Sequence, residues 1–202
     1  MKNKKYWIII TCLLLIFVTN TIFVVLGKTT GFDSYIYKLV RSLECGFCDK
    51  YFVFITKFGN VPVVIGIVAL LIMLFRNRHG IMCFLAAACS AGTNKLLKHI
   101  IRRERPGVLK LIKQGGYSYP SGHSMISVSL YGYLLYLAFT KIKNSILKWV
   151  CSIILVILIL SIGISRIYVG VHYASDILGG YTLALIELML LIKFGEKHFR
   201  GN

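Results

Sequence analysis

Two histidines lie beside residue types that suit an attack on phosphorus. His172 precedes Asp176 by four residues, and on a helix this spacing lets the carboxylate accept a hydrogen bond from one imidazole nitrogen. That bond fixes the tautomer and leaves the other nitrogen as a nucleophilic lone pair. His123 follows Pro120-Ser121-Gly122 at a predicted helix start, where free amides and the helix dipole attract an anion. For the His172 and Asp176 pair alone, the alternative is a purely structural contact.

Basic side chains at the ends of neighbouring apolar segments could hold a dianionic phosphate. Lys98 and Arg105 are seven residues apart, which is two helical turns, so we expect both to project from nearly the same side of a helix. Arg166 ends a later apolar segment, and a guanidinium offers paired donors to phosphate oxygens. Ser121 can cap the helix that begins there, and Gly122 lets an anion approach the backbone closely. The alternative is a collar of cations that reach toward lipid headgroups.

The elements that must position these residues are long apolar segments. Hydrophobic residues make up 57% of the 202-residue chain and charged residues only 15%, which excludes an ordinary soluble domain. Six blocks are each long enough to cross about 30 Å of hydrocarbon as a helix. These blocks are Tyr6–Leu26, Phe52–Phe75, Gly80–Ile101, Ser121–Phe139, Trp149–Tyr168 and Ala174–Phe194. The sequence therefore predicts an all-α fold, with residues 1–202 forming one integral-membrane domain, a bundle of six transmembrane helices.

Six crossings bring the reactive residues to one membrane face. The ends of the third and fifth helices share that face with the starts of the fourth and sixth, whichever way the N-terminus points. We favour an inner N-terminus, because the inner segments are rich in Lys and Arg and carry Glu196 as their one acidic residue. The active site would then face the extracytoplasmic side of the plasma membrane. Basic loops that attract anionic lipid also explain the net charge of +17 without nucleic-acid binding.

Three further features have more than one interpretation. The loop Lys28–Tyr51 carries apolar residues at spacings of three and four, which predicts an amphipathic helix in the headgroup layer or an ordinary packed loop helix. Cys45 and Cys48 in this loop form either a local disulfide or two free thiols. Glu187, in the middle of the last apolar block, is expected to hydrogen-bond within the bundle rather than to line a transport path.

The reactive residues fall into three runs: Lys98-(six residues)-Arg105-Pro106, Pro120-Ser121-Gly122-His123, and Ser165-Arg166-(five residues)-His172-(three residues)-Asp176. These runs resemble the three signature motifs of the type-2 phosphatidic acid phosphatase superfamily, whose six-helix membrane architecture matches the whole chain. The resemblance implies that His172 attacks phosphorus, that Asp176 orients it, and that His123 protonates the leaving group and then activates water. It also implies a phosphate site, made by Lys98, Arg105, Ser121, Gly122 and Arg166. No metal or other cofactor is implied.

The resemblance predicts a lipid phosphatase that works through a phosphohistidine intermediate on a lipid phosphate or pyrophosphate in the bilayer. Among bacterial members of the family, undecaprenyl pyrophosphate and phosphatidylglycerophosphate are equally good candidates for the substrate, and phosphatidate ranks behind them. The alternative from another class is a transporter of an anionic lipid or ion that uses the same basic cluster, with Asn94 and Glu187 along its path. The sequence gives no indication of the oligomeric state.

Overall fold

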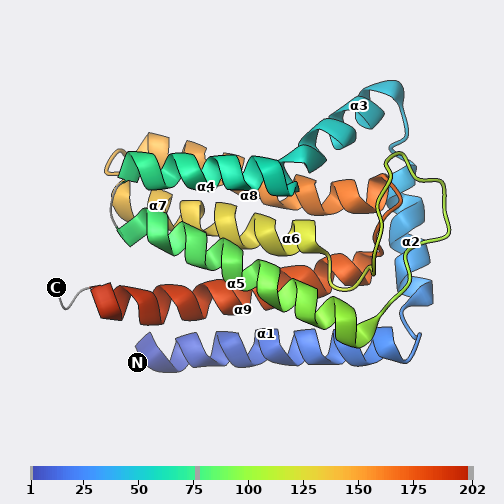
Figure 1. Ribbon diagram of the computed structural model, residues 1–202, viewed down its shortest axis with the longest axis horizontal. Helices are drawn as coiled ribbons and strands as arrows, with labels where there is room; N and C mark the ends of the chain where they lie inside the picture. Colours follow the sequence, from blue (N-terminus) through green and yellow to red (C-terminus); the bar gives the residue numbers. More distant parts are fainter. Residues whose placement is uncertain (1, 76–77, 200–202) are drawn as a thin grey trace.

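Helices are the only regular elements in the part of the chain that the computed structural model describes, residues 2–75 and 78–199. Most of them run side by side along the long axis, and α1 begins at the same end of the bundle where α9 ends (Figure 1). The long helices are α1 (Lys2–Val25), α4 (Val61–Phe75), α5 (Arg78–Ile101), α8 (Ser145–Tyr168) and α9 (Ala174–Phe199). The shorter ones are α2 (Thr30–Arg41), α3 (Gly46–Ile55), η1 (Thr56–Gly59), α6 (Gly122–Ile126), η2 (Ser127–Tyr131) and α7 (Gly132–Lys141).

The apolar blocks do form membrane-length helices, but the count of six is approximate. Four described helices are long and apolar enough to cross a membrane, namely Lys4–Val25, His79–Ile101, Ser145–Tyr168 and Ala174–Gly195. A fifth span results if Gly46–Gly59 and Val61–Met73, which meet at 54°, are taken together. Residues 122–141 are helical throughout, but the π-helical turn η2 separates α6 from α7. The all-α membrane fold is therefore confirmed.

The expectation of one continuous helix over Phe52–Phe75 is wrong. The chain breaks at Asn60, which has an extended backbone with φ −75° and ψ 143°. Pro62 follows in the first turn of α4, where a residue without an N–H is tolerated because that N–H has no helical partner. The break matters for function because it turns the side chain of Asn60 toward the site described below.

At the end of the bundle where the termini lie, α1 packs against α9. The Tyr6 hydroxyl donates to the carbonyl of Met189 at 2.7 Å, and the Lys193 ammonium lies 4.2 Å and 4.1 Å from the ring centroids of Tyr6 and Trp7. Such an aromatic and cationic cluster is typical of a membrane–water interface. The side chain of Glu196, which entered the orientation argument, lies outside the described residues.

At the opposite end α2 lies across the bundle, roughly perpendicular to the long helices (Figure 1). The amphipathic helix expected in this loop is therefore present. Asp33 and Val40 point inward and are buried, whereas Phe32, Tyr35 and Leu39 are exposed. The two cysteines that follow α2 are free thiols, and the first of them caps α3.

Candidate active site

Three chain segments converge at the end of the bundle that α2 covers. They are the end of α5 with residues 102–105, the loop that leads into α6, and the connection between α8 and α9. A cavity of about 860 Å³ has Lys98, Arg105, Gly122, His123 and His172 in its wall, so five of the eight predicted site residues line one space. The other three, Ser121, Arg166 and Asp176, are fully buried behind that wall.

His172 is held in one tautomer from two sides. Its Nδ1 lies 3.2 Å from Asp176 Oδ2, which is the hydrogen bond expected from the sequence. Its Nε2 lies 3.2 Å from Arg105 Nη1, and because a guanidinium can only donate, Nε2 must present a lone pair. Burial lowers the pKa of His172 to about 3, against the opposing effect of the Asp176 bond. The imidazole is therefore neutral, and its Nε2 lone pair meets Arg105 at the cavity wall.

Lys98 and Arg105 bind backbone carbonyls of one short turn. The Lys98 ammonium donates to Tyr117 O at 2.6 Å. The Arg105 guanidinium donates to the carbonyls of Gly115, Gly116 and Tyr117 at 2.9 to 3.2 Å. Gly116 has a φ of +70°, a conformation that favours glycine, and it turns these carbonyls toward the arginine. Both cations therefore have neutral partners that a phosphate oxygen could replace.

The expectation that Lys98 and Arg105 share one helix face is wrong, although both reach the cavity. The helix α5 ends at Ile101, and Arg102 has a φ of +50°, which turns the chain out of the helix. Arg105 therefore reaches the cavity from an irregular segment. The spacing of the two cations is set by this turn and not by helical periodicity.

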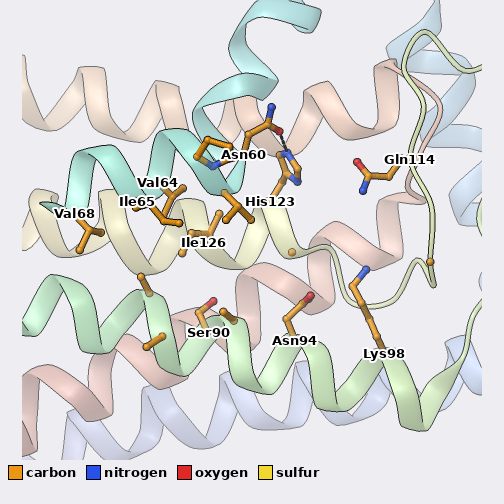
Figure 2. Close-up of a pocket in the computed structure, with 18 of the residues that line it drawn as sticks. Asn60, Val64, Ile65, Val68, Ser90, Asn94, Lys98, Gln114, His123 and Ile126 are labelled. Carbon is orange, nitrogen blue, oxygen red and sulfur yellow. Dashed lines mark hydrogen bonds between the residues drawn. The ribbon is translucent and has the colours of Figure 1, made fainter.

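The start of α6 brings His123 against the break before α4. Ser121 caps α6 by accepting from Ser124 N at 3.4 Å. His123 Nε2 lies 2.8 Å from Asn60 Oδ1, and because that amide oxygen only accepts, Nε2 carries the proton (Figure 2). A Cβ on Gly59 would come within 2.5 Å of the His123 ring, so glycine is required for this close approach. Neither Gly59 nor Asn60 was predicted from the sequence as part of the site.

Arg166 is completely buried, and its guanidinium is only partly satisfied. One terminal nitrogen donates to Thr56 Oγ1 at 2.5 Å and the other to Gln114 Oε1 at 3.0 Å. Its Nε has no hydrogen-bond partner within the described structure. A buried N–H without an acceptor is unfavourable, so this group favours an anion in the cavity.

A second layer of charged residues lies behind His172 and was not predicted as part of the site. Arg103 bridges Asp176 and Asp33, the latter from α2. A weak signal for Arg103 was its place in the basic run 102–105. For Asp33 no sequence signal was available, because its partner is 70 residues away.

The cavity continues from the polar site into an apolar groove between α4 and α5. In Figure 2, Lys98, Gln114 and His123 lie toward one end, and Val64, Ile65 and Val68 of α4 lie toward the other. The facing side of α5 contributes Phe84 and then a run of small residues, Ala87, Ala88, Ser90 and Ala91. In the described part of the chain, no group of three His, Cys, Asp or Glu side chains is arranged to hold a metal ion.

The fold and the site define an integral-membrane helical enzyme with a histidine- and arginine-lined anion site. Residues 78–200 match the PAP2 superfamily. Phosphatidylglycerophosphatase B of Bacillus subtilis is 33% identical over 142 residues, which are 68% of each chain. An undecaprenyl-diphosphatase of Sulfolobus acidocaldarius is 31% identical over 193 residues, covering 91% of this chain and 87% of the relative. The chain therefore belongs to the PAP2 superfamily, and it is a lipid phosphatase of that family.

Two solved structures share the fold. The crystal structure of a transmembrane PAP2-type phosphatidylglycerolphosphate phosphatase from Bacillus subtilis has a TM-score of 0.82 and 28% identity, covering 93% of this chain and 96% of that one. The crystal structure of Aquifex aeolicus LpxE has a TM-score of 0.68 at 21% identity, covering 80% of this chain and 95% of that one. The first match supports the membrane architecture of the whole bundle, and the second supports the fold alone.

Proposed function

We propose that this chain, acting as one membrane-embedded domain over residues 1–202, removes phosphate from a membrane lipid through a phosphohistidine formed on His172. The observation that carries the proposal is the state of this imidazole. Its Nδ1 is bonded to Asp176, and its Nε2 lone pair accepts from Arg105 at the wall of a cavity that Lys98 and His123 also line. A neutral imidazole oriented in this way is a nucleophile that needs no further activation.

The reaction would proceed in two transfers. His172 Nε2 attacks phosphorus, the bond from phosphorus to the leaving oxygen breaks, and His123 donates a proton to that oxygen. Water then attacks the phosphohistidine while His123 takes up one of its protons, which restores His172 and releases inorganic phosphate. A positioned acid and base of this kind typically contributes about 10²- to 10⁴-fold in rate.

The remaining predicted site residues would stabilise the transferring phosphoryl group. Lys98 and Arg105 would exchange the carbonyls they now bind for phosphate oxygens. Arg166, whose Nε is unpartnered in the described structure, would add positive charge from behind the cavity wall. The backbone at Gly122 would add a donor, and Ser121 would keep the start of α6 in place. Because charge spreads over the equatorial oxygens in such a transfer, converging cations are the expected catalytic device.

The apolar groove supports a lipid as the substrate. It begins at the polar site and continues between β-branched residues of α4 and small residues of α5, so a hydrocarbon chain can lie there while its phosphate reaches His172. Between lipids the groove does not discriminate. Relatives named as a phosphatidylglycerophosphatase and an undecaprenyl-diphosphatase make phosphatidylglycerophosphate and undecaprenyl pyrophosphate equally good candidates, and phosphatidate ranks behind them.

We propose that the site faces the extracytoplasmic side of the plasma membrane. Support comes from the position of the site at the end of the bundle opposite the start of α1 (Figure 1). The basic residues expected on the inner side are the second argument for this orientation, because Lys4 and Lys5 begin the chain's first span.

The two residues considered for a transport path, Asn94 and Glu187, do not form one by themselves. Asn94 Nδ2 donates to Pro120 O at 2.9 Å, so this residue braces the start of α6. Glu187 lies inside the bundle close to Thr93 of α5, although neither of its oxygens has a partner within 3.5 Å in the described structure. An isolated carboxyl group does not by itself define a path across the membrane.

Inorganic phosphate release by the detergent-purified protein tests the proposal. The three candidate lipids are compared with EDTA present, because the proposed chemistry uses no metal. We expect release to persist with the chelator, and the ranking of rates identifies the preferred lipid. Loss of activity in EDTA that added Mg²⁺ or Zn²⁺ restores would contradict the metal-independent mechanism.

A further inference from the structure

Behind His172, the two carboxylate oxygens of Asp176 accept hydrogen bonds from different partners. Oδ2 accepts from His172 Nδ1 at 3.2 Å and from Tyr173 N at 3.0 Å. Oδ1 accepts from Arg103 Nη1 at 2.5 Å. With one oxygen held by the arginine, the carboxylate cannot rotate freely, and the other oxygen stays directed at the imidazole.

Arg103 is itself fixed on its remaining sides. Its Nη2 donates to Asp33 Oδ2 at 2.7 Å and to Thr29 Oγ1 at 3.0 Å. Its guanidinium carbon lies 4.1 Å from the centroid of the Tyr173 ring, a stacking geometry that favours a cation. The guanidinium therefore has one defined orientation between two carboxylates.

Asp33 joins this network to α2 and to the start of α9. It is 3% exposed, and it accepts from Ser175 N at 2.9 Å and from Ser175 Oγ at 2.8 Å. Ser175 Oγ also accepts from Arg103 Nη1 at 2.8 Å. Asp33 and Asp176 are thus two buried carboxylates on either side of one guanidinium, and Arg103 is the cation that separates and balances them.

We infer that Arg103 and Asp33 are positioning residues that hold Asp176, and through it His172, in the geometry needed for attack on phosphorus. The inference rests on the proposed role of His172. Neither residue touches the cavity, and neither belongs to the three motif runs as fixed positions. Without Arg103, the two carboxylates repel one another at close range in a buried site, so Asp176 turns away from His172 or takes up a proton. Either change removes the acceptor that fixes the imidazole tautomer.

Charge removal in two steps tests this inference. Arg103→Met should lower kcat by about 100-fold and leave KM within about threefold, because the cavity wall is unchanged. Asp33→Asn in the same chain removes one of the two repelling charges and keeps an acceptor for Ser175. The double variant Asp33→Asn/Arg103→Met should therefore recover at least about tenfold of the lost kcat. A merely structural role for Arg103 predicts no recovery, since the double variant lacks more native contacts than the single one.

The pH profile provides a second readout that simple loss of packing would not move. The charged and titratable groups around His172 are Asp176 from α9, Arg166 from α8, Lys98 from α5, His123 from α6, Arg103 and Arg105 from the segment after α5, and Asp33 from α2. Without the Arg103 charge, Asp176 takes up a proton at higher pH, because Asp33 then faces it with no balancing cation, and His172 loses its charged partner. The acid limb of kcat/KM should therefore move to higher pH in Arg103→Met and move back in the double variant.

Two reference variants distinguish failure of the positioning inference from failure of the proposed function. Arg102→Met changes the neighbouring exposed arginine, whose one side-chain bond among the described residues is to the carbonyl of His99, and it should retain activity within about twofold. His172→Ala reports on the proposed function. If His172→Ala is inactive but Arg103→Met is normal, or if the double variant is no better than Arg103→Met, the positioning inference is overturned and the proposed function stands.

If His172→Ala keeps its activity, the proposed function fails, whatever the arginine variants do. Should Arg103→Met not yield folded protein by size-exclusion chromatography and circular dichroism, Arg103→Lys takes its place. It keeps the charge but lacks the fork that spans both carboxylates, so we expect an approximately tenfold loss of kcat with KM unchanged. Full activity of Arg103→Lys would show that the bridge is not needed and would overturn the inference.

Discussion

The two sides of the active site differ in how their polar groups are satisfied. On the nucleophile side, defined by His172 and Asp176, both side chains are buried and bond charged or polar groups that are themselves fixed. On the cationic side, defined by Lys98 and Arg105, most hydrogen bonds go to backbone carbonyls of residues 115–117, at the edge of the cavity. The nucleophile is therefore pre-organised, whereas the cations hold partners that a phosphate can displace.

This difference matches the demands of phosphoryl transfer. A nucleophile must be oriented before the substrate arrives, because reorientation during the reaction adds to the barrier. Cations that bind the substrate must instead exchange their partners in each turnover. Arg105 connects the two sides, since Nη1 lies near His172 Nε2 while Nε and Nη2 bond carbonyls. An entering phosphate would draw this arginine away from the imidazole lone pair and so uncover the nucleophile.

The largest expected effect comes from breaking the nucleophile side. His172→Ala should lower phosphate release by at least about 10⁴-fold, because the proposed reaction begins with attack by this imidazole. The protein should stay folded by size-exclusion chromatography. The matched control is His99→Ala at the exposed end of α5, where the imidazole has one hydrogen bond in the described part of the chain, to the carbonyl of Lys95. We expect wild-type activity there.

Removing a cation from the other side should have a smaller effect. Lys98→Met should reduce kcat/KM by about 10²-fold, since one donor to the phosphate is lost while Arg105 and Arg166 remain. Lys95→Met, one turn earlier on α5 and exposed, should stay within about twofold of wild type. Equal losses in the two variants would mean that general surface charge, and not a defined phosphate contact, is responsible.

The contribution of the groove to lipid binding can be tested separately from the chemistry by filling the groove with a large side chain. Ala91→Trp places a large side chain in the groove and should reduce kcat/KM for a long-chain lipid phosphate by about 10- to 100-fold. A water-soluble aryl phosphate should be hydrolysed at the wild-type rate. Leu85→Trp, on the same helix but outside the groove, serves as the control. A parallel loss for both substrates would show that the bulky residue disturbs the site itself.

Removing the hydrogen-bond partner of His123 should reduce activity less than the changes above. Asn60→Leu removes the acceptor of His123 Nε2 and should lower kcat by about tenfold, with the greatest loss for poor leaving groups that need a proton. Asn60→Asp keeps an acceptor oxygen and should retain more activity than Asn60→Leu. The order is checked with aryl phosphates of graded leaving-group pKa, and a loss that is the same for all of them would exclude a role in protonation.

The smallest effect is expected in the pH dependence. Because burial lowers the pKa of His172 to about 3, the imidazole stays neutral as the pH falls through 6.5, and its protonation removes activity only near pH 3 in the free enzyme. An acid limb of kcat/KM between pH 5 and 7 should then follow the phosphate pKa of the substrate. Two substrates with different phosphate pKa values test this. A limb near 6.5 that does not change with the substrate would contradict the burial of His172.

The sequence predicted the parts of the molecule that depend on local pattern. Apolar block length predicted the spans α1, α5, α8 and α9, and the spacing of His172 and Asp176 predicted their hydrogen bond. The break at Asn60 was missed because the block was delimited by hydropathy alone, although Gly59, Asn60 and Pro62 are residue types typical of a helix break. The turn at Arg102, which ends α5, was not predicted for the same reason.

The supporting layer of the site was not predictable, since it is made by contacts that are distant in the chain. Asp33 meets Arg103 across 70 residues, and Asn60 meets His123 across 63. Each is a common polar residue in an otherwise ordinary stretch. Only the packing of α2 and of the start of α4 against the end of the bundle brings them to the histidines.

The central claim is tested most directly by trapping the intermediate. The protein is mixed with a lipid phosphate labelled with ³²P, quenched in alkali within milliseconds, and digested for mass spectrometry. We predict acid-labile, alkali-stable phosphate on the peptide that contains His172, and none in His172→Ala. Phosphate release in a single turnover with no label on the protein, or label on any residue other than His172, would contradict the account.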